Sequence, residues 1–283
     1  MLESLSGRTN PIYIWLNGPK DESDRKLIIE SRAIILKHSN LNVIAVKLNQ
    51  NHFSSGDSIA SAITWIFDHV DSAIILEDDI IPTQHFLENT ETLLNVFATN
   101  FEVGSILGSN FVPTEFIANP QVPYRATNFI SSWGWATWAN RWQHFEHSLM
   151  GWENYQEKLP ISVSNYFGRR KWMHIFTSIQ DGSFDSWDYK WQFTNWKNQW
   201  VSIVPNSNLV QNIGFTAEAT HTFQRPWWFS DEVENSILDL EIVSIDLSVD
   251  HGADRWVATN IHPSGNWYWI KTNIMNFIKR VSN

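Results

Sequence analysis

Residues 73–82 read Ala-Ile-Ile-Leu-Glu-Asp-Asp-Ile-Ile-Pro, and expectations for the rest of the chain follow from this stretch. Four apolar residues are followed directly by three adjacent carboxylates, Glu77, Asp78 and Asp79. A short and continuous apolar run of this kind is typical of a strand that is buried on both faces of a parallel sheet. The sequence therefore predicts a buried strand whose carboxyl end carries a cluster of negative charge.

The three acids indicate a cation site. Doubly wound sheets bind their ligands at the carboxyl ends of the strands, and like charges that are crowded there repel one another unless a cation is present. Carboxylates prefer hard cations such as magnesium or manganese, which in turn hold phosphate oxygens. The plainer alternative is a solvated strand end, with Pro82 and Thr83 starting the next helix. The stretch by itself favours neither interpretation.

The composition narrows the class of protein. The length of 283 residues fits one domain of catalytic size, expected at 1–227, and a C-terminal extension, expected at 228–283. The net charge of −10 argues against nucleic acid as the main partner. The chain has no cysteine, which excludes disulfides and thiolate metal sites. No secretory signal and no run of 18 apolar residues is visible, so we expect a cytoplasmic location.

Tryptophan is unusually abundant, with 17 residues. A core does not need so many, because Trp is bulky and its indole N–H requires a partner when it is buried. The excess suggests flat apolar platforms of the kind that bind sugars, although some of these residues must lie in the core. Trp133 and Trp135 are the platform candidates, and Gly134 between them permits a close approach of the backbone.

Strand-like and helix-like segments alternate over the first 110 residues. The expected strands are 11–16, 43–48, 73–76 and 103–107. The expected helices lie between these strands and after the third one, at about 23–38, 59–70 and 86–97. This alternation predicts an α/β fold with a mostly parallel central sheet flanked by helices. Neither a dinucleotide-binding glycine motif nor a P-loop follows the first strand.

The end of the chain predicts an amphipathic helix at 267–281, with basic residues outside its apolar stripe. Such a helix could lie on a membrane surface, which would place the protein at the inner face of the membrane. Packing on its own domain is the more common role for a helix of this kind, and we expect the C-terminal extension to pack in this way.

A series of short motifs resembles a known family. In chain order they are Leu-Glu-Asp-Asp at 76–79, Ser-Asn at 109–110, Tyr-Arg at 124–125, Trp-Gly-Trp-Ala-Thr-Trp at 133–138, Trp-Asp at 187–188, Asn-Ile-Gly-Phe at 212–215 and Thr-His-Thr at 220–222. This order, which covers about residues 11–225, resembles bacterial sugar transferases of the Rossmann-like GT-A fold. More distantly, it is similar to the Golgi N-acetylglucosaminyltransferase I family.

The resemblance implies a metal-dependent glycosyltransferase of polysaccharide biosynthesis. The donor would be a nucleotide-diphosphate sugar, UDP-linked, and the acceptor a glycan or glycoprotein, with inversion at the anomeric carbon. Asp79 matches the position that contacts the divalent cation, manganese or magnesium, and His221 resembles a late metal ligand. Asp78 matches the position nearer the ribose, and Glu77 the position nearer the base or sugar.

The general base implied by the resemblance is Asp188. The distant family has two Asp at this point where this chain has one after Trp187, which leaves Asp185 as a rival. The chemistry itself requires such a group, because a sugar hydroxyl is a poor nucleophile and must lose its proton as it attacks. For Arg141, which could assist the diphosphate, a surface salt bridge is the alternative. The candidate donor-binding residues, with Glu77 and Asp78, are Asn17, Lys26, Asn110, Trp133, Gly134, Trp135 and Arg141.

Two other functions remain open. A sugar nucleotidyltransferase also needs acids and magnesium, but it usually has a Gly-rich loop bearing Arg or Lys after the first strand. This chain has only Asn-Gly-Pro-Lys at 17–20. A non-catalytic carbohydrate-binding module would use the Trp platforms and would leave the acid cluster without a role.

Overall fold

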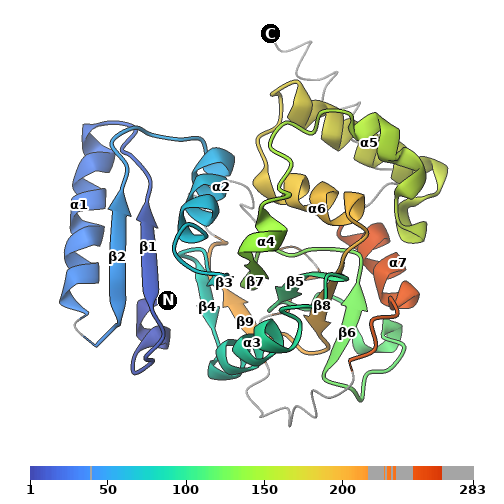
Figure 1. The fold of residues 1–283 in the computed structure, drawn as a ribbon, viewed down its shortest axis with the longest axis horizontal. Helices are drawn as coiled ribbons and strands as arrows, with labels where there is room; N and C mark the ends of the chain where they lie inside the picture. The colour runs from blue at the N-terminus through green and yellow to red at the C-terminus, as the bar shows by residue number, and fades with distance from the viewer. Residues whose placement is uncertain (39, 216–225, 227, 231, 234–244, 263–283) are drawn as a thin grey trace.

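The computed structural model describes the chain except for residues 39, 216–225, 227, 231, 234–244 and 263–283. His221 and the predicted helix at 267–281 therefore lie outside the described residues. The described part is a mixed α/β structure in which a five-stranded sheet is flanked by helices (Figure 1). None of its helices combines the length and the hydropathy that a membrane-spanning segment needs.

The N-terminal part is a strand–helix–strand unit. After a short 3-10 helix, η1 (Leu2–Leu5), β1 (Ile12–Leu16) and β2 (Val43–Leu48) pair in parallel and are joined by α1 (Glu22–Lys37). This two-stranded sheet is separate from the central sheet and lies to its left in Figure 1. The strands agree with the predicted segments to within one residue, and α2 (Ser55–Ile66) follows them as expected.

The central sheet has the strand order β3-β7-β5-β8-β6. Its strands are β3 (Ser72–Ile75), β5 (Val103–Leu107), β6 (Tyr124–Thr127), β7 (Trp135–Trp138) and β8 (Val201–Pro205). Only β5 and β8 are parallel neighbours, and the other neighbouring pairs of this sheet are antiparallel. The prediction of a mostly parallel sheet is therefore wrong. The reason is β7, which inserts between β3 and β5 and whose Trp spacing matches neither a strand nor a helix period.

A second short ladder follows the acids. Strand β4 (Ile80–Pro82) pairs antiparallel with β9 (Val210–Asn212), and α3 (Gln84–Val96) begins directly afterwards. Thr83 caps α3, because its Oγ1 accepts a hydrogen bond of 3.0 Å from the backbone N–H of Phe86. The helix start predicted at Thr83 is thus confirmed, whereas Pro82 is the last residue of β4. The three acids lie in the tight turn between β3 and β4.

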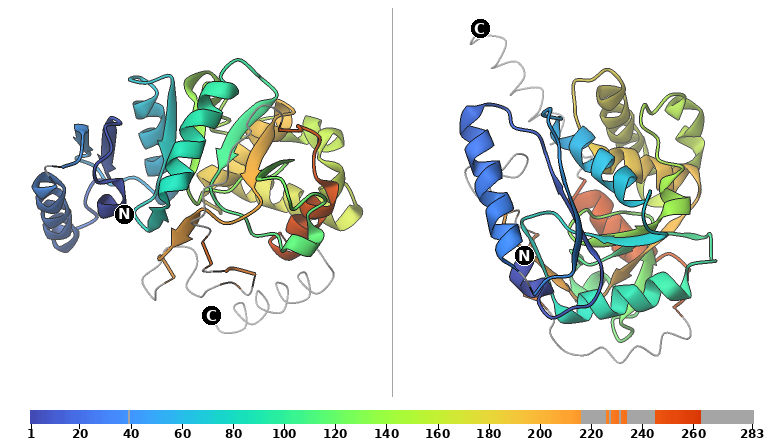
Figure 2. Two further views of the ribbon diagram at one scale, coloured as in Figure 1. Left: turned by 90° about the horizontal axis from the view of Figure 1, so that it is seen from below. Right: turned by 60° about the vertical axis from the view of Figure 1, so that its left-hand side comes forward.

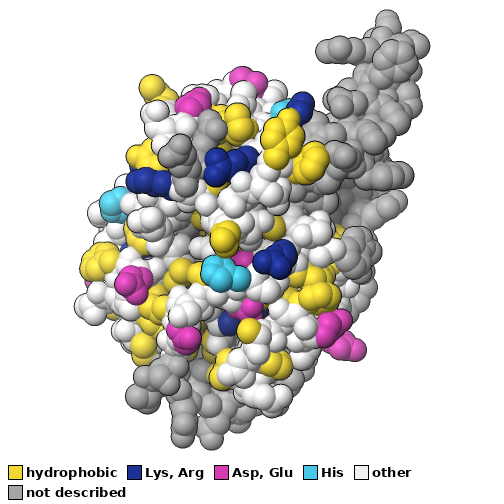
Figure 3. Space-filling view, turned by 90° about the vertical axis from the view of Figure 1, so that its right-hand side faces the viewer, with side chains coloured by type: hydrophobic (Ala, Val, Ile, Leu, Met, Phe, Trp, Pro, Cys, Tyr) yellow, Lys and Arg dark blue, Asp and Glu magenta, His cyan; other side chains and the backbone are white. Residues whose placement is uncertain are grey.

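Helices cover both faces of the central sheet. Apolar residues of α3 pack with one face, and those of α2 and α6 (Trp187–Lys197) pack with the other (Figures 1 and 2). The remaining helices are α4 (Ala139–Trp142), α5 (Tyr166–Gln180) and α7 (His251–Asn260), with 3-10 helices η2 (Thr114–Phe116), η3 (Trp152–Lys158) and η4 (Ile161–Val163). On the face where α5 and α7 lie, charged side chains of both signs are scattered among apolar ones (Figure 3).

Helix α7 comes from the region after residue 227 and is tied to β6 by a buried carboxylate. Asp254 is fully buried and accepts a hydrogen bond from the hydroxyl of Thr127 at 2.5 Å. It also accepts hydrogen bonds from the backbone N–H and the side-chain amide of Asn128, at 3.1 and 2.9 Å. These bonds satisfy the buried oxygens and fix α7 beside the sheet.

Candidate functional site

A groove with a volume of about 1670 Å³ runs between β1 and β3. Residues 12–16 and 72–75 of the two strands line it, and so do Glu77, Asp78 and Asp79 at the carboxyl end of β3. The groove thus connects an apolar channel between two strands with the acid cluster that the sequence predicted.

Asp188 approaches this cluster from α6. It lines the same groove, and its charge acts on Glu77. Burial together with the charges of Asp79, Asp188 and Asp78 raises the pKa of Glu77 to about 8. Burial and the neighbouring Asp78 also raise the pKa of Asp79. The fold therefore brings four acids together from two segments that are more than a hundred residues apart in the sequence.

The start of α6 holds Asp188 in place. Ser186 caps the helix, since its Oγ accepts a hydrogen bond of 3.2 Å from the backbone N–H of Tyr189. The same hydroxyl donates to Oδ1 of Asp188, which also accepts from the N–H of Tyr189 at 3.0 Å. Trp187 stacks on Trp135 of β7 with ring centroids 5.4 Å apart. These contacts fix the direction of the helix start and hence the position of the Asp188 carboxylate.

Asp79 lies against the loop that follows β9. Its carbonyl accepts a hydrogen bond of 2.9 Å from the N–H of Ile213. A Cβ atom at Gly214 would lie 2.0 Å from Oδ2 of Asp79, so glycine leaves room for this carboxylate in its present position. The pairing of β4 with β9 produces this approach, and no sequence pattern predicted it. Among the described residues, no Lys or Arg forms an ion pair with Glu77, Asp78 or Asp79.

Asp185, the rival base, has a structural partner. Its Oδ2 accepts a hydrogen bond of 2.9 Å from the backbone N–H of Gly56, in the first turn of α2. A carboxylate at this position is favoured by the helix dipole. Asp185 lines the groove, but Asp188 is the acid of this pair whose charge acts on Glu77.

Asn17 and Lys26 have different positions relative to the groove. Asn17 lines it, and its amide group is used in the turn after β1, where it donates to the carbonyl of Phe53 at 2.9 Å. Its oxygen accepts from the N–H groups of Gly18 and Phe53 at 2.9 and 3.1 Å. Lys26 is exposed on α1 and is not part of the groove lining. The donor-binding role of Lys26 therefore stays a prediction that the groove lining does not support.

Asn110 does not contact the groove either. Its side chain donates to the carbonyls of Val112 and Asn206 and accepts from Arg125 at 2.9 Å. Burial lowers the pKa of Arg125 to about 10, and the side-chain oxygens of Asn110 and Asn206 satisfy two of its N–H groups. The half-buried Asn110 is thus engaged in a polar network away from the groove lining, and its donor-binding role stays a prediction.

The Trp-Gly-Trp stretch divides between the groove and the core. Trp135 is 1% exposed and packs among Trp142, Trp187 and Trp191, so its prediction as a platform is wrong. Gly134 has φ +63°, and a Cβ there would lie 2.8 Å from Cγ1 of Val210. Its close backbone neighbour is therefore a core side chain rather than a ligand.

Trp133 is the residue of this stretch that lines the groove. It belongs to a cluster of aromatic rings beside the Gly214 loop, and its ring stacks on that of Trp228 with centroids 6.0 Å apart. The other rings that contact it meet it edge to face, and they are Phe111, Phe215 and Phe229. The half-buried ring thus forms part of the wall close to Asp79.

Arg141 is fully buried under the loop that precedes β5. Its guanidinium lies 4.5 Å from the ring centroid of Trp138 and donates to the side chain of Asn140 at 2.8 Å. It also donates to the backbone carbonyls of Phe97, Ala98, Asn100 and Val103. Both the predicted donor contact and its alternative, a surface salt bridge, are wrong, because the guanidinium is buried and its N–H donors are used by these carbonyls and by Asn140.

Replacing Arg141 with Met is expected to destabilise the fold by about 3–5 kcal/mol, because the hydrogen bonds of this buried guanidinium to the loop before β5 would all be lost. Urea unfolding followed by tryptophan fluorescence measures this loss. The control is Arg255→Met, at an exposed position of α7, which is expected to change stability by less than about 0.5 kcal/mol. Equal stability of the two variants would contradict the structural role of Arg141.

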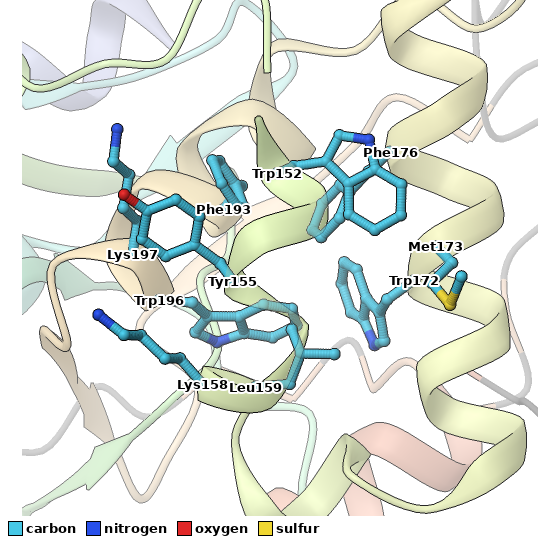
Figure 4. Close-up of a pocket in the computed structure, with 10 residues that line it drawn as sticks. All are labelled: Trp152, Tyr155, Lys158, Leu159, Trp172, Met173, Phe176, Phe193, Trp196 and Lys197. Atoms are coloured by element: carbon cyan, nitrogen blue, oxygen red, sulfur yellow. The ribbon is translucent and has the colours of Figure 1, made fainter. Parts of the chain in front are cut away.

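A second aromatic pocket lies between η3, α5 and α6 (Figure 4). Its walls are mainly aromatic rings, among them Trp152, Trp172, Phe176 and Trp196, with Lys158 and Lys197 at one side. The volume is about 10 Å³, which is room for a single water molecule. This cluster is therefore a packed core, and it offers no platform to a sugar.

The raised pKa of Glu77 predicts a pH dependence of stability. The folded protein binds this proton more tightly than the unfolded chain, because the pKa rises from 4.5 to about 8. Stability should therefore fall as pH rises between these two values, by at most about 1.4 kcal/mol per pH unit. Glu77→Gln should remove this loss and be more stable than the parent protein at pH 8 but not at pH 4.5.

Urea unfolding of the two proteins at pH 4.5, 6.5 and 8 tests this expectation. Glu102→Gln, at an exposed glutamate outside the groove, is the matched control and should follow the parent protein at every pH. If the free energy of unfolding of Glu77→Gln changed with pH in parallel with that of the parent protein, Glu77 would be ionised in the folded state at neutral pH.

No set of three His, Cys, Asp or Glu side chains within the described residues is arranged as a complete metal site. The site is thus an open groove that ends in acids, with one aromatic wall and a carboxylate supplied by α6. No model of a known protein family matches the chain, and no curated protein sequence matches it.

Proposed function

We propose that this protein is a glycosyltransferase of the GT-A fold that moves a sugar from a nucleotide-diphosphate donor, UDP-linked, to a glycan or glycoprotein acceptor. The observation that carries the proposal is the meeting of Asp188 with the acid cluster at the end of β3. A base and a charge-rich cation site are the two groups that this transfer needs, and they line one groove.

The residues at this end of the groove fit a divalent cation. Asp79 and Asp78 offer carboxylate oxygens, which are the ligands that manganese and magnesium prefer. Burial and the neighbouring Asp78 raise the pKa of Asp79, and a bound cation would favour its charged form. Asp79 would hold the cation, and His221 remains a proposed further ligand. When bound, the cation would offset the negative charge that grows on the departing diphosphate.

Asp188 would act as the general base. The acceptor hydroxyl oxygen forms a bond to the anomeric carbon while the bond from that carbon to the diphosphate oxygen breaks, and Asp188 takes the hydroxyl proton. One displacement of this kind inverts the configuration at the anomeric carbon. Asp188 lies in the first turn of α6, and its hydrogen bond with Ser186 keeps the carboxylate pre-oriented.

Glu77 would serve a different purpose from its two neighbours. With a pKa of about 8 it is mainly protonated at neutral pH. A protonated carboxyl group donates a hydrogen bond, so Glu77 could bind an oxygen of the base or the sugar. Trp133 would supply an apolar wall beside the sugar.

The proposal predicts that a nucleoside diphosphate and manganese raise the melting temperature only when both are present. At ligand concentrations about 100 times Kd, the rise should be roughly 5 °C or more. Thermal unfolding of the whole protein with UDP, GDP, ADP, CDP and dTDP, each with and without manganese chloride, measures it. The Asp79→Ala variant is the control and should show no rise.

The same measurement, extended to nucleoside triphosphates, sugar phosphates and free glycans, separates the alternative functions. A sugar nucleotidyltransferase would be stabilised by a nucleoside triphosphate and a sugar phosphate and would release pyrophosphate. A carbohydrate-binding module would be stabilised by free glycans, without any dependence on manganese. No rise with any nucleoside diphosphate would contradict the glycosyltransferase proposal.

A further inference from the structure

The loop between α5 and α6 carries an exposed aromatic ring close in sequence to the candidate base. Phe184 is 37% exposed and lines the groove that Asp188 also lines. Among the described residues, its ring meets that of Tyr189 of α6, with centroids 5.8 Å apart. Within the same part of the chain, Phe184 belongs to none of the apolar clusters of the interior. Packing of the core therefore does not account for an aromatic residue at this position.

Hydrogen bonds hold this loop in one conformation. Gly182 has φ +79°, which glycine adopts readily, and the chain turns there after α5. The backbone N–H of Phe184 donates to the carbonyl of Ser178 at 2.9 Å, and the Ser183 hydroxyl donates to the same carbonyl at 3.2 Å. The next residue, Asp185, is bonded to the first turn of α2. A ligand that contacts the ring of Phe184 therefore need not order the loop when it binds.

Asp185 adds a polar group beside the ring. It is exposed and lines the groove. Its Oδ2 accepts from the N–H of Gly56 at 2.9 Å, whereas its Oδ1 accepts no hydrogen bond from the described residues. A carboxylate oxygen of this kind can accept a hydrogen bond from a hydroxyl group. A flat apolar ring next to such an acceptor suits a pyranose sugar, which has an apolar C–H face and hydroxyl groups at its edge.

The ring of Phe184 and the ring of Trp133 line the groove beside different acids. Trp133 lies by the Gly214 loop that contacts Asp79, where the cation and the diphosphate would bind. Phe184 belongs to the loop that leads into the first turn of α6 and hence to Asp188. A general base must reach the hydroxyl that attacks. A sugar that stacks on Phe184 would therefore be the acceptor, and the donor would lie on the Trp133 side.

We propose that the acceptor is a saccharide whose terminal pyranose stacks on Phe184 and donates a hydroxyl hydrogen bond to Asp185, with its attacking hydroxyl at Asp188. The assignment of this sugar as the acceptor rests on the proposed glycosyltransferase function. It narrows the acceptor to the end of a glycan, because a serine or threonine hydroxyl of an unglycosylated protein brings no ring that could stack on Phe184.

Ligand-observed NMR tests the sugar site without requiring turnover. The probes are the methyl glycosides of glucose, galactose, mannose and N-acetylglucosamine, added to the whole protein with UDP and magnesium, since paramagnetic manganese would broaden the signals. Saturation transfer from the protein to ring C–H protons should be seen with at least one glycoside. In Phe184→Ala this transfer should fall at least about tenfold, the usual scale for losing an apolar contact in a binding pocket.

Two further variants make the test specific. Phe184→Trp keeps a flat ring and should retain glycoside binding. Phe167→Ala is the matched control, because Phe167 is also 37% exposed but lies on α5, outside the groove lining. It should bind the glycosides as the parent protein does. The rise in melting temperature with UDP and manganese should be the same in the parent protein and in all three variants, because Phe184 would not contact the donor.

The two measurements separate this proposal from the glycosyltransferase proposal. If UDP and manganese raise the melting temperature but no glycoside binds, or if Phe184→Ala binds glycosides as well as the parent protein, the saccharide site is overturned and the glycosyltransferase proposal stands. Glycoside binding that depends on Phe184, without any rise with UDP and manganese, would overturn the acceptor role and favour a carbohydrate-binding module.

Discussion

Replacing Asp79 with Ala is expected to lower metal-dependent sugar transfer by at least about 10²- to 10³-fold, the usual effect of losing one group that stabilises developing charge. Asp79 lies at the mouth of the groove, and no Lys or Arg within the described residues forms an ion pair with it. The fold should be retained, because the loss of this charge relieves its repulsion with Asp78. Transfer rates with increasing manganese, together with the melting temperature, measure both effects.

The matched control for this substitution is Asp71→Ala. Asp71 is an exposed acid just before β3, the strand that the acid cluster follows, and it is not part of the groove lining. The Asp71→Ala variant should leave both transfer and its manganese dependence unchanged. If Asp79→Ala retained the rate and metal dependence of the parent protein, the cation would have to bind elsewhere.

Replacing Asp188 with Asn is expected to lower kcat by about 10²- to 10⁴-fold, the usual contribution of a general base. The amide oxygen of Asn can still accept the hydrogen bonds from Ser186 and the N–H of Tyr189, so the start of α6 should stay in place. Donor affinity, measured by calorimetry with UDP and manganese, should change by less than about threefold because the base acts on the acceptor.

Asp185→Asn separates the two candidate bases. Its carboxylate holds the first turn of α2 through the N–H of Gly56, and an Asn oxygen can accept the same bond. We expect transfer to fall by less than about tenfold in this variant, far less than the loss of a general base. Normal transfer by Asp188→Asn, with a large loss in Asp185→Asn, would assign the base to Asp185 instead.

Local patterns predicted the elements whose structure depends on neighbours in the sequence. The strands 43–48 and 103–107 lie where the apolar runs predicted them, and the acids follow β3 as the 73–82 stretch indicated. These segments are short, apolar and bounded by polar turns, so their own residues favour one conformation.

Predictions from residue type were wrong where segments distant in the sequence decide whether a side chain is buried. Arg141 and Trp135 were predicted at the donor site, yet each is held in the interior by groups from other strands and loops. A basic or aromatic side chain is equally compatible with a ligand and with partners in the protein interior. Only the positions of its neighbours decide between them.

The sequence by itself determined that three carboxylates stand at the end of a strand, because that feature is local and continuous. The predicted burial of this strand on both faces of a parallel sheet is wrong, since β3 is half-buried and pairs antiparallel with β7. The tertiary structure alone decided that β7 enters the sheet antiparallel, that β9 brings Gly214 against Asp79, and that α6 brings Asp188 to the groove where its charge acts on Glu77. These relations join residues up to about 130 positions apart through strand pairing and core packing, and no local period records such pairings.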